Sequence, residues 1–324
     1  MTIAYRGSVL HFLGDPDKLA PQDAWEYFQD GVLVVADGHV RQLGDAQALL
    51  AGLGDEVDVL DCSGDLLLPG FVDTHVHYPQ TEIIGAGGEP LLPWLQHHAF
   101  PVEARFADTL HARAVAEVFL DEMLRAGTTT ALVFATVHPA SVDAFFEACA
   151  HRDLRMIAGK VLMDRNAPPE LCDTVESGYA DSRTLIKRWH QRGRARYAVT
   201  PRCAPTSTPA QLRAAGRLLR EYPDVYMHTH LSENSAEVAW ARELFPDCDT
   251  YLDAYDQAGL VGRRSIFAHC IHLQDAEWDR LAETRSGIAF CPTSNLFLGS
   301  GLFPLPRAVR QQVRVGLGTD VGAG

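Results

Sequence analysis

The stretch Leu-Pro-Gly-Phe-Val-Asp-Thr-His-Val-His-Tyr-Pro-Gln, residues 68–80, decides the fold. Its apolar, β-branched run is typical of a short buried strand that ends in His75 and His77. Side chains on a strand alternate between its two faces, so both imidazoles point the same way and could share a metal ion. The same alternation recurs at His228 and His230 and can arise by chance. A metal site therefore needs partners from elsewhere in the chain.

The composition is that of a globular protein that acts on small molecules. The 324 residues are 47% hydrophobic and 22% charged, which predicts a sizeable core. The net charge of −14, without a basic cluster, argues against nucleic-acid and membrane partners. No apolar run approaches the roughly 20 residues of a membrane span, and no secretory signal opens the chain, so we expect a cytoplasmic protein. The seven scattered cysteines, without a Cys-x-x-Cys pair, are typical of reduced thiols.

The hydrophobic pattern divides the chain into two parts. Residues 1–67 predict a small N-terminal β module, in which Asp37-Gly38 marks a hairpin turn between two apolar runs. Residues 68–324 alternate apolar strands with amphipathic helices. Eight strand-like runs cover residues 71–77, 128–137, 155–163, 196–203, 225–231, 265–270, 287–291 and 314–319. This repetition predicts an α/β fold, and eight units favour a (β/α)8 barrel over a doubly wound sheet.

Reactive side chains stand at the ends of several predicted strands. The fifth run leads into His230 and Glu233, the sixth ends at His269, and the eighth leads to Asp320. Active sites of such barrels lie at the C-terminal ends of the strands, so these groups should meet the paired histidines of the first run. Each alone has a structural explanation, such as a hydrogen-bonded core histidine or a helix-capping aspartate. Together they predict a metal site that keeps a position open for water, and therefore hydrolysis.

These motifs resemble those of the amidohydrolase superfamily and follow the same order. The matching stretches are residues 69–77, 230–234, 268–269 and 318–320. Others resemble the branch of the superfamily that deaminates guanine: residues 78–80, 91–95, 160–167, 201–202 and 291–296. The resemblance covers the chain from about Leu68 to its end. It implies a (β/α)8 barrel beside half of a β-sandwich.

The resemblance also implies a reaction, which is the zinc-dependent hydrolytic deamination of guanine to xanthine and ammonia. One zinc ion per chain would be held by His75, His77, His230, His269 and Asp320. Asp320 would also accept a proton from the attacking water, and Glu233 would carry a proton to the ring and the leaving amine. A homodimer is expected as well.

The implied contacts to the purine begin with Gln80 and Arg202. Arginine offers a planar fork of donors that suits a purine carbonyl, and glutamine offers both a donor and an acceptor. Both side chains could instead anchor loops. Cys203 is expected to touch the substrate too, although members of the family often have an aromatic residue there.

The sequence allows more than one role for each of three further features. Leu92 and Trp94 belong to the long connection 78–127, which we expect to be only partly helical and to cover the substrate, with a local core as the alternative. Lys160 and the turn after it could form a structural ion pair or a pocket wall. His228 lies one layer below His230 on the same strand face, so we expect it to pack in the core.

Two sequence features limit the chemistry. Arg202 stands where dinuclear relatives place a metal-bridging lysine, which argues against two metals. The His-x-Glu and Pro-Cys-x-x-Cys pattern of the nucleic-acid deaminases is missing.

The sequence stops just after Asp320, where relatives continue, so we expect it to be part of a longer chain. The alternative is a short variant that a partner subunit completes.

Two other functions compete with guanine deamination. A sister enzyme could act on another amino-purine, a pyrimidine or a triazine, because few contacts tune such a pocket. A non-catalytic barrel could serve as a binding module, although such proteins generally lose ligands that this sequence retains.

Overall fold

The computed structural model describes residues 2–15 and 18–323. The chain folds into two compact units, Met1–Gly70 and Phe71–Gly324. Within the described residues, no helix combines the length and the apolar character that crossing a membrane requires.

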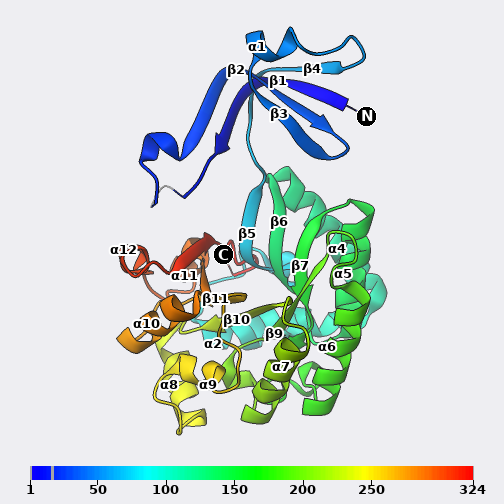
Figure 1. Ribbon diagram of the computed structural model, residues 1–324. Coiled ribbons are helices and arrows are strands. Elements are labelled where there is room, and N and C mark those ends of the chain that lie inside the picture. Colours follow the sequence, from blue (N-terminus) through cyan, green and yellow to red (C-terminus); the bar gives the residue numbers. More distant parts are fainter. Residues whose placement is uncertain (1, 16–17, 324) are drawn as a thin grey trace. The chain divides into compact units, whose positions relative to one another are not determined.

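The first unit contains a four-stranded sheet with the order β3-β2-β1-β4 (Figure 1). Its elements are β1 (Thr2–Phe12), η1 (Pro21–Asp23), β2 (Trp25–Ala36), β3 (His39–Asp45), α1 (Ala46–Leu50) and β4 (Asp58–Leu67). Asp37 and Gly38 have φ values of 53° and 73°, as a tight hairpin between β2 and β3 requires. A small core forms around Ala4, Val32 and Val34. The predicted β module is confirmed.

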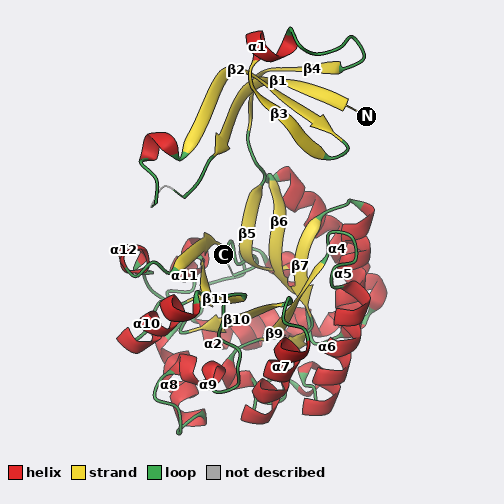
Figure 2. Cartoon of the chain, viewed as in Figure 1, coloured by secondary structure: helices red, strands yellow, loops and turns green. Residues whose placement is uncertain are grey.

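The second unit is a nearly closed barrel of eight parallel strands (Figures 1 and 2). The strands follow the order β13-β12-β11-β10-β9-β7-β6-β5, and the short β8 pairs with β9. Their bounds are β5 (Phe71–His77), β6 (Thr128–Phe134), β7 (Arg155–Gly159), β8 (Val161–Leu162), β9 (Arg196–Pro201), β10 (Tyr226–Leu231), β11 (Ser265–His269), β12 (Gly287–Phe290) and β13 (Arg314–Leu317). The predicted (β/α)8 fold is confirmed, and the third predicted run is divided into β7 and β8.

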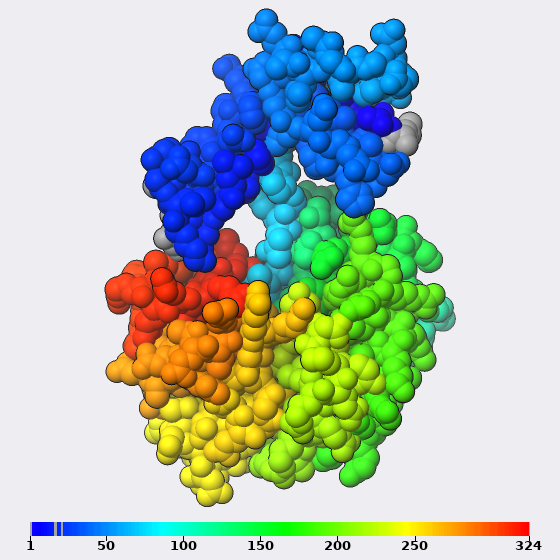
Figure 3. All heavy atoms as spheres, in the orientation of Figure 1, coloured from blue at the N-terminus to red at the C-terminus, as the bar shows by residue number. Residues whose placement is uncertain are grey.

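Helices lie outside the strands of the barrel (Figure 2). On the face seen in Figure 3, successive segments pass from green through yellow and orange to red. The helices are α4 (Thr109–Arg125), α5 (Pro139–His151), η5 (Pro169–Leu171), α6 (Val175–Trp189), η6 (Ala204–Thr206), α7 (Pro209–Glu221), α8 (Ser235–Leu244), α9 (Tyr251–Asp256), α10 (Asp275–Thr284), α11 (Pro292–Phe297) and α12 (Leu305–Arg310). In α7, Leu212, Ala215 and Leu218 recur every third residue and are buried. This spacing places them on one face of the helix, which packs into the main core.

The connection between β5 and β6 is more helical than expected. It contains η2 (Tyr78–Ile83), α2 (Leu91–Trp94), η3 (Leu95–Ala99), α3 (Phe100–Ala104) and η4 (Arg105–Ala107) before α4 begins. Each of these turns is too short to show a helical period in the sequence. Their buried side chains, among them Trp94, Phe100 and Phe106, hold the turns in place.

Hydrogen bonds between β5 and the end of β13 complete the ring. The Thr74 hydroxyl donates to the Leu317 carbonyl at 2.8 Å, and the Asp320 N–H donates to the His75 carbonyl at 2.9 Å. The His77 N–H donates to the Val321 carbonyl at 2.8 Å. These bonds hold the first and last groups of the predicted site next to each other.

Candidate functional site

Four strands bring the five predicted metal ligands together at one end of the barrel. His75 and His77 lie on β5, His230 on β10 and His269 on β11, and Asp320 follows β13. One ligand atom from each of His75, His230, His269 and Asp320 lies within 4.8 Å of the others. Nε2 of His77 lies 3.2 Å from Nε2 of His75, from Nε2 of His230 and from Oδ1 of Asp320.

The backbone is strained where two of these ligands leave their strands. His269 has a φ of 69° and Asp320 a φ of 53°, although neither is a glycine. Such left-handed conformations cost of order 1–3 kcal/mol each and persist where the surrounding structure holds them. Here they turn both side chains into the cluster.

Three of the imidazoles are oriented by a second group. In each ring Nδ1 has a hydrogen-bond partner, which leaves Nε2 for the cluster. The partners are His228 Nε2 at 2.8 Å for His75, the Arg202 carbonyl at 2.7 Å for His230 and Asn295 Oδ1 at 2.9 Å for His269. Nε2 of His269 is buried and has no hydrogen-bond partner among the described residues. Aligned imidazole nitrogens beside one carboxylate fit a zinc-type ion.

The surroundings of His77, His230 and Asp320 favour the protonation states that bind metals. Burial lowers the pKa of His77 to about 4 and holds the pKa of His230 well below its usual value. Burial opposes ionisation of Asp320, yet His75 and His77 hold the pKa of Asp320 well below its usual value. Neutral imidazoles and an ionised carboxylate are the forms that coordinate a cation.

Glu233 lies beside the cluster and is the candidate acid. Its Oε2 is 3.5 Å from Nε2 of His269, and its backbone N–H donates to Glu237 Oε2 at 2.9 Å. Burial, followed by the negative charges of Asp320 and Glu237, raises the pKa of Glu233 well above its usual value. The raised pKa favours the protonated form of the carboxyl group, which is the form that can donate a proton.

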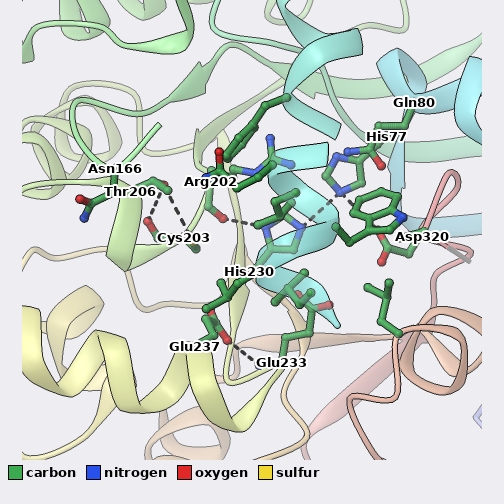
Figure 4. A pocket seen from close by; sticks show the side chains of 18 of the residues that line it. His77, Gln80, Asn166, Arg202, Cys203, Thr206, His230, Glu233, Glu237 and Asp320 are labelled. Atoms are coloured by element: carbon green, nitrogen blue, oxygen red, sulfur yellow. Dashed lines mark hydrogen bonds and ion pairs between the residues drawn. The ribbon is translucent and has the colours of Figure 1, made fainter. Parts of the chain in front are cut away.

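A cavity of about 350 Å³ opens onto the cluster (Figure 4). Polar groups from several elements line it: His77, Gln80, Asn166, Arg202, Thr206, His230, Glu233, Glu237 and Asp320. Much of the remaining lining is apolar or aromatic, including Leu92, Trp94, Phe100 and Trp240. A mainly apolar cavity with a few convergent polar groups is typical of a site for a small molecule.

The residues predicted to hold the substrate all line this cavity. Gln80 comes from η2, Leu92 and Trp94 from α2, and Arg202 and Cys203 from the loop after β9. The Cys203 thiol lies 3.5 Å from the Thr206 hydroxyl. Part of the connection after β5 thus forms one wall of the cavity.

A buried carboxylate that the sequence analysis did not single out joins two of these residues. Glu103, on α3, is 1% exposed. It accepts one hydrogen bond from Gln80 Nε2 at 2.8 Å and another from Arg202 Nη1 at 2.6 Å. No motif marks this glutamate in the sequence, because its partners lie 23 and 99 residues away.

The sequence left the roles of Lys160, of the turn after it and of His228 open between structural support and a place in the site. Lys160 is fully buried in an ion pair with Asp173, so its role is structural. Asn166, in the turn that follows, lines the cavity. His228 is fully buried, as expected, and it also contacts a predicted ligand through its bond to His75.

Comparison with known proteins gives one consistent result. Residues 66–324 match the Amidohydrolase family. Guanine deaminase of Escherichia coli is 54% identical over 324 residues, which cover 99% of this chain and 73% of that protein. The crystal structure of guanine deaminase from Bradyrhizobium japonicum has a TM-score of 0.96 at 41% identity, covering 100% of this chain and 71% of that one. Guanine deaminase from C. acetobutylicum, with guanine bound in its active site, has a TM-score of 0.92 at 28% identity and corresponding coverages of 100% and 75%.

Proposed function

The chain belongs to the amidohydrolase family, and we propose that it catalyses the hydrolytic deamination of guanine to xanthine and ammonia. One arrangement carries this proposal. A buried cluster of imidazoles and a carboxylate shares a single cavity with Glu233 and with the Gln80–Arg202 pair. The likeness to guanine deaminases over nearly the whole chain supports the choice of substrate.

One zinc ion per chain is the proposed cofactor. The ligands are His75, His77, His230, His269 and Asp320. Bound there, zinc lowers the pKa of a water molecule toward neutrality and so supplies the nucleophile. The hydrogen bonds to Nδ1 of His75, His230 and His269 would leave their Nε2 atoms free to hold the ion.

Two carboxyl groups move the protons of the reaction. Asp320 accepts a proton from the water as its oxygen forms a bond to C2 of guanine. Glu233, whose raised pKa favours its protonated form, donates a proton to the ring nitrogen beside that carbon. Asp320 then passes its proton to the exocyclic amine, the C–N bond breaks and the amine leaves as ammonia. As the C2 carbonyl forms, the hydroxyl proton on C2 passes to Glu233 and restores it. Guanine and water are thus converted to xanthine and ammonia.

The base is held by Gln80 and Arg202, which line the same cavity as Glu233. Arg202 donates to the purine carbonyl, and Gln80 completes the contact to the neighbouring ring edge. The side chains of Leu92, Trp94 and Cys203 pack against the ring. Their apolar surfaces favour a flat aromatic base and exclude bulk water.

Metal removal and return test this proposal. The purified protein should release ammonia and xanthine in equal amounts from guanine. A chelator should abolish the reaction, and one equivalent of zinc per chain should restore it. A chelated, metal-free protein that still converts guanine would refute the zinc-dependent mechanism. A cytoplasmic homodimer stays a prediction from the sequence, which sedimentation velocity and cell fractionation would check.

A further inference from the structure

The two oxygens of the Glu103 carboxylate have different partners. Oε1 accepts from the Gln80 amide, and Oε2 accepts from the Arg202 guanidinium. All three side chains are at most 3% exposed, so water does not compete for these bonds. One buried carboxylate therefore holds both of the side chains proposed to bind the base.

We propose that Glu103 is a positioning residue that makes the pocket selective for a 6-oxopurine. In this role it fixes which hydrogen-bonding groups Gln80 and Arg202 present to the substrate. The inference rests on the proposed function. It adds a physical reason why the site would prefer one hydrogen-bonding edge of a purine ring over another.

The contact with Glu103 sets the orientation of the Gln80 amide. An ionised carboxylate can only accept hydrogen bonds, so the NH2 group of Gln80 must face it. The reversed amide would place two acceptors against each other. Oε1 of Gln80 is then the group left over. Among the described residues it accepts one long contact, at 3.4 Å, from the Gly322 N–H. Gln80 therefore offers an acceptor.

Glu103 also fixes Arg202 and balances its charge. A buried guanidinium without a counter-charge is costly, and Glu103 supplies that charge at 2.6 Å. The guanidinium carbon lies 5.2 Å from the centre of the Phe100 ring, which restricts the side chain further. Arg202 uses Nη1 for Glu103 and keeps other N–H groups for the cavity that it lines. It therefore offers donors.

An acceptor and donors held by one carboxylate match one particular ring edge. Guanine has an N–H at position 1 beside a carbonyl at position 6, which is the complement of Gln80 and Arg202. Adenine carries the reverse pattern at these positions. 2-Aminopurine keeps the 2-amine that is hydrolysed but lacks both the N1–H and the carbonyl. A site built to pair with these groups leaves its buried polar atoms unpaired when such an analogue binds.

The test compares guanine with 2-aminopurine in the zinc-loaded E103Q variant. Glutamine at this position can donate to Gln80 Oε1 and so allows the Gln80 amide to turn over. We expect the ratio of kcat/KM for guanine to that for 2-aminopurine to fall on the order of 100-fold or more. The loss should come from a raised KM for guanine, while 2-aminopurine changes little.

A matched control is E122Q, because Glu122 forms an exposed ion pair with Arg125 outside the site. Its substrate ratio should equal that of the unchanged protein. An unchanged ratio in folded E103Q would overturn the inference, and so would an equal loss for both substrates, which indicates support of the pocket alone. If E103Q does not fold, E103D takes its place, since it keeps the charge but is too short to reach both partners.

Failure of the proposed function would look different. The unchanged protein would then hold zinc but convert neither guanine nor 2-aminopurine. Selectivity could still be measured, because 2-aminopurine is fluorescent and guanine can displace it. A ratio of dissociation constants that favours guanine in the unchanged protein and falls in E103Q would support the role of Glu103. A ratio that the substitution leaves unchanged would overturn it.

Discussion

Nε2 of His228 lies 2.8 Å from Nδ1 of His75, and both imidazoles are fully buried. A hydrogen bond between two ring nitrogens contains one proton. If His75 gives the lone pair of Nε2 to a metal, its Nδ1 holds that proton and donates it to His228. His228 then carries its own proton on Nδ1, which has no partner among the described residues. A histidine expected to pack in the core therefore also orients a predicted ligand.

Replacing His228 by phenylalanine should weaken zinc binding. Phenylalanine retains an aromatic ring but removes the acceptor that orients His75, a type of change that typically costs 10–100-fold in metal affinity. Competition with a chromogenic chelator measures this directly. His228→Gln should retain more affinity, because its side-chain carbonyl can accept the bond. Equal zinc affinity in the phenylalanine variant and the unchanged protein would contradict the orienting role.

Glu233→Gln should keep its zinc and lose turnover. The amide has nearly the same shape but cannot transfer the proton, and loss of a general acid typically costs about 10²–10⁴-fold in rate. Steady-state kinetics on guanine, with metal analysis of the same sample, gives both results. Glu243→Gln, an exposed position on helix α8, which begins two residues after Glu233, is the control. Near-normal turnover in the Glu233 variant would remove this residue from the mechanism.

His269→Ala should weaken metal retention rather than proton transfer. The substitution deletes a ring whose Nε2 faces the cluster and whose Nδ1 is held by Asn295. Dialysis against a mild chelator, followed by elemental analysis, should leave this variant with less zinc than the unchanged protein. If one zinc per chain remains, His269 is not a ligand.

Lys160→Met should destabilise the barrel unit. It leaves the Asp173 carboxylate, 9% exposed, without its partner, and breaking a buried pair in this way typically costs about 3–5 kcal/mol. Urea unfolding measures the loss. The double variant Lys160→Met/Asp173→Leu should recover part of the stability, because no buried charge is left unpaired. Equal stability of the single and double variants would show that the pair is not coupled.

The fold and the metal cluster could be predicted because their signals are local in the sequence. The alternation at His75 and His77 and the strand-end positions of His230, His269 and Asp320 place all five groups at one end of a parallel barrel. The eight strand-like runs agree with the observed strands for the same reason, since each run carries its own apolar pattern.

The supporting residues could not be predicted, because their roles depend on contacts between distant segments. Glu103 is a single glutamate in a connection of short helical turns, and nothing near it in the sequence points to Gln80 or Arg202. The bond of His228 depends on how β5 and β10 face each other across the barrel. Both roles became apparent only from hydrogen bonds in the folded chain.

The central claim is that this site deaminates guanine with one zinc ion. Ultraviolet-monitored turnover tests it most directly, with guanine, adenine, cytosine and 8-oxoguanine run in parallel and bound zinc measured in the same sample. We expect rapid conversion of guanine to xanthine at one zinc per chain and slow or no reaction with the other bases. A folded protein that holds one zinc per chain and leaves guanine unchanged would contradict the claim.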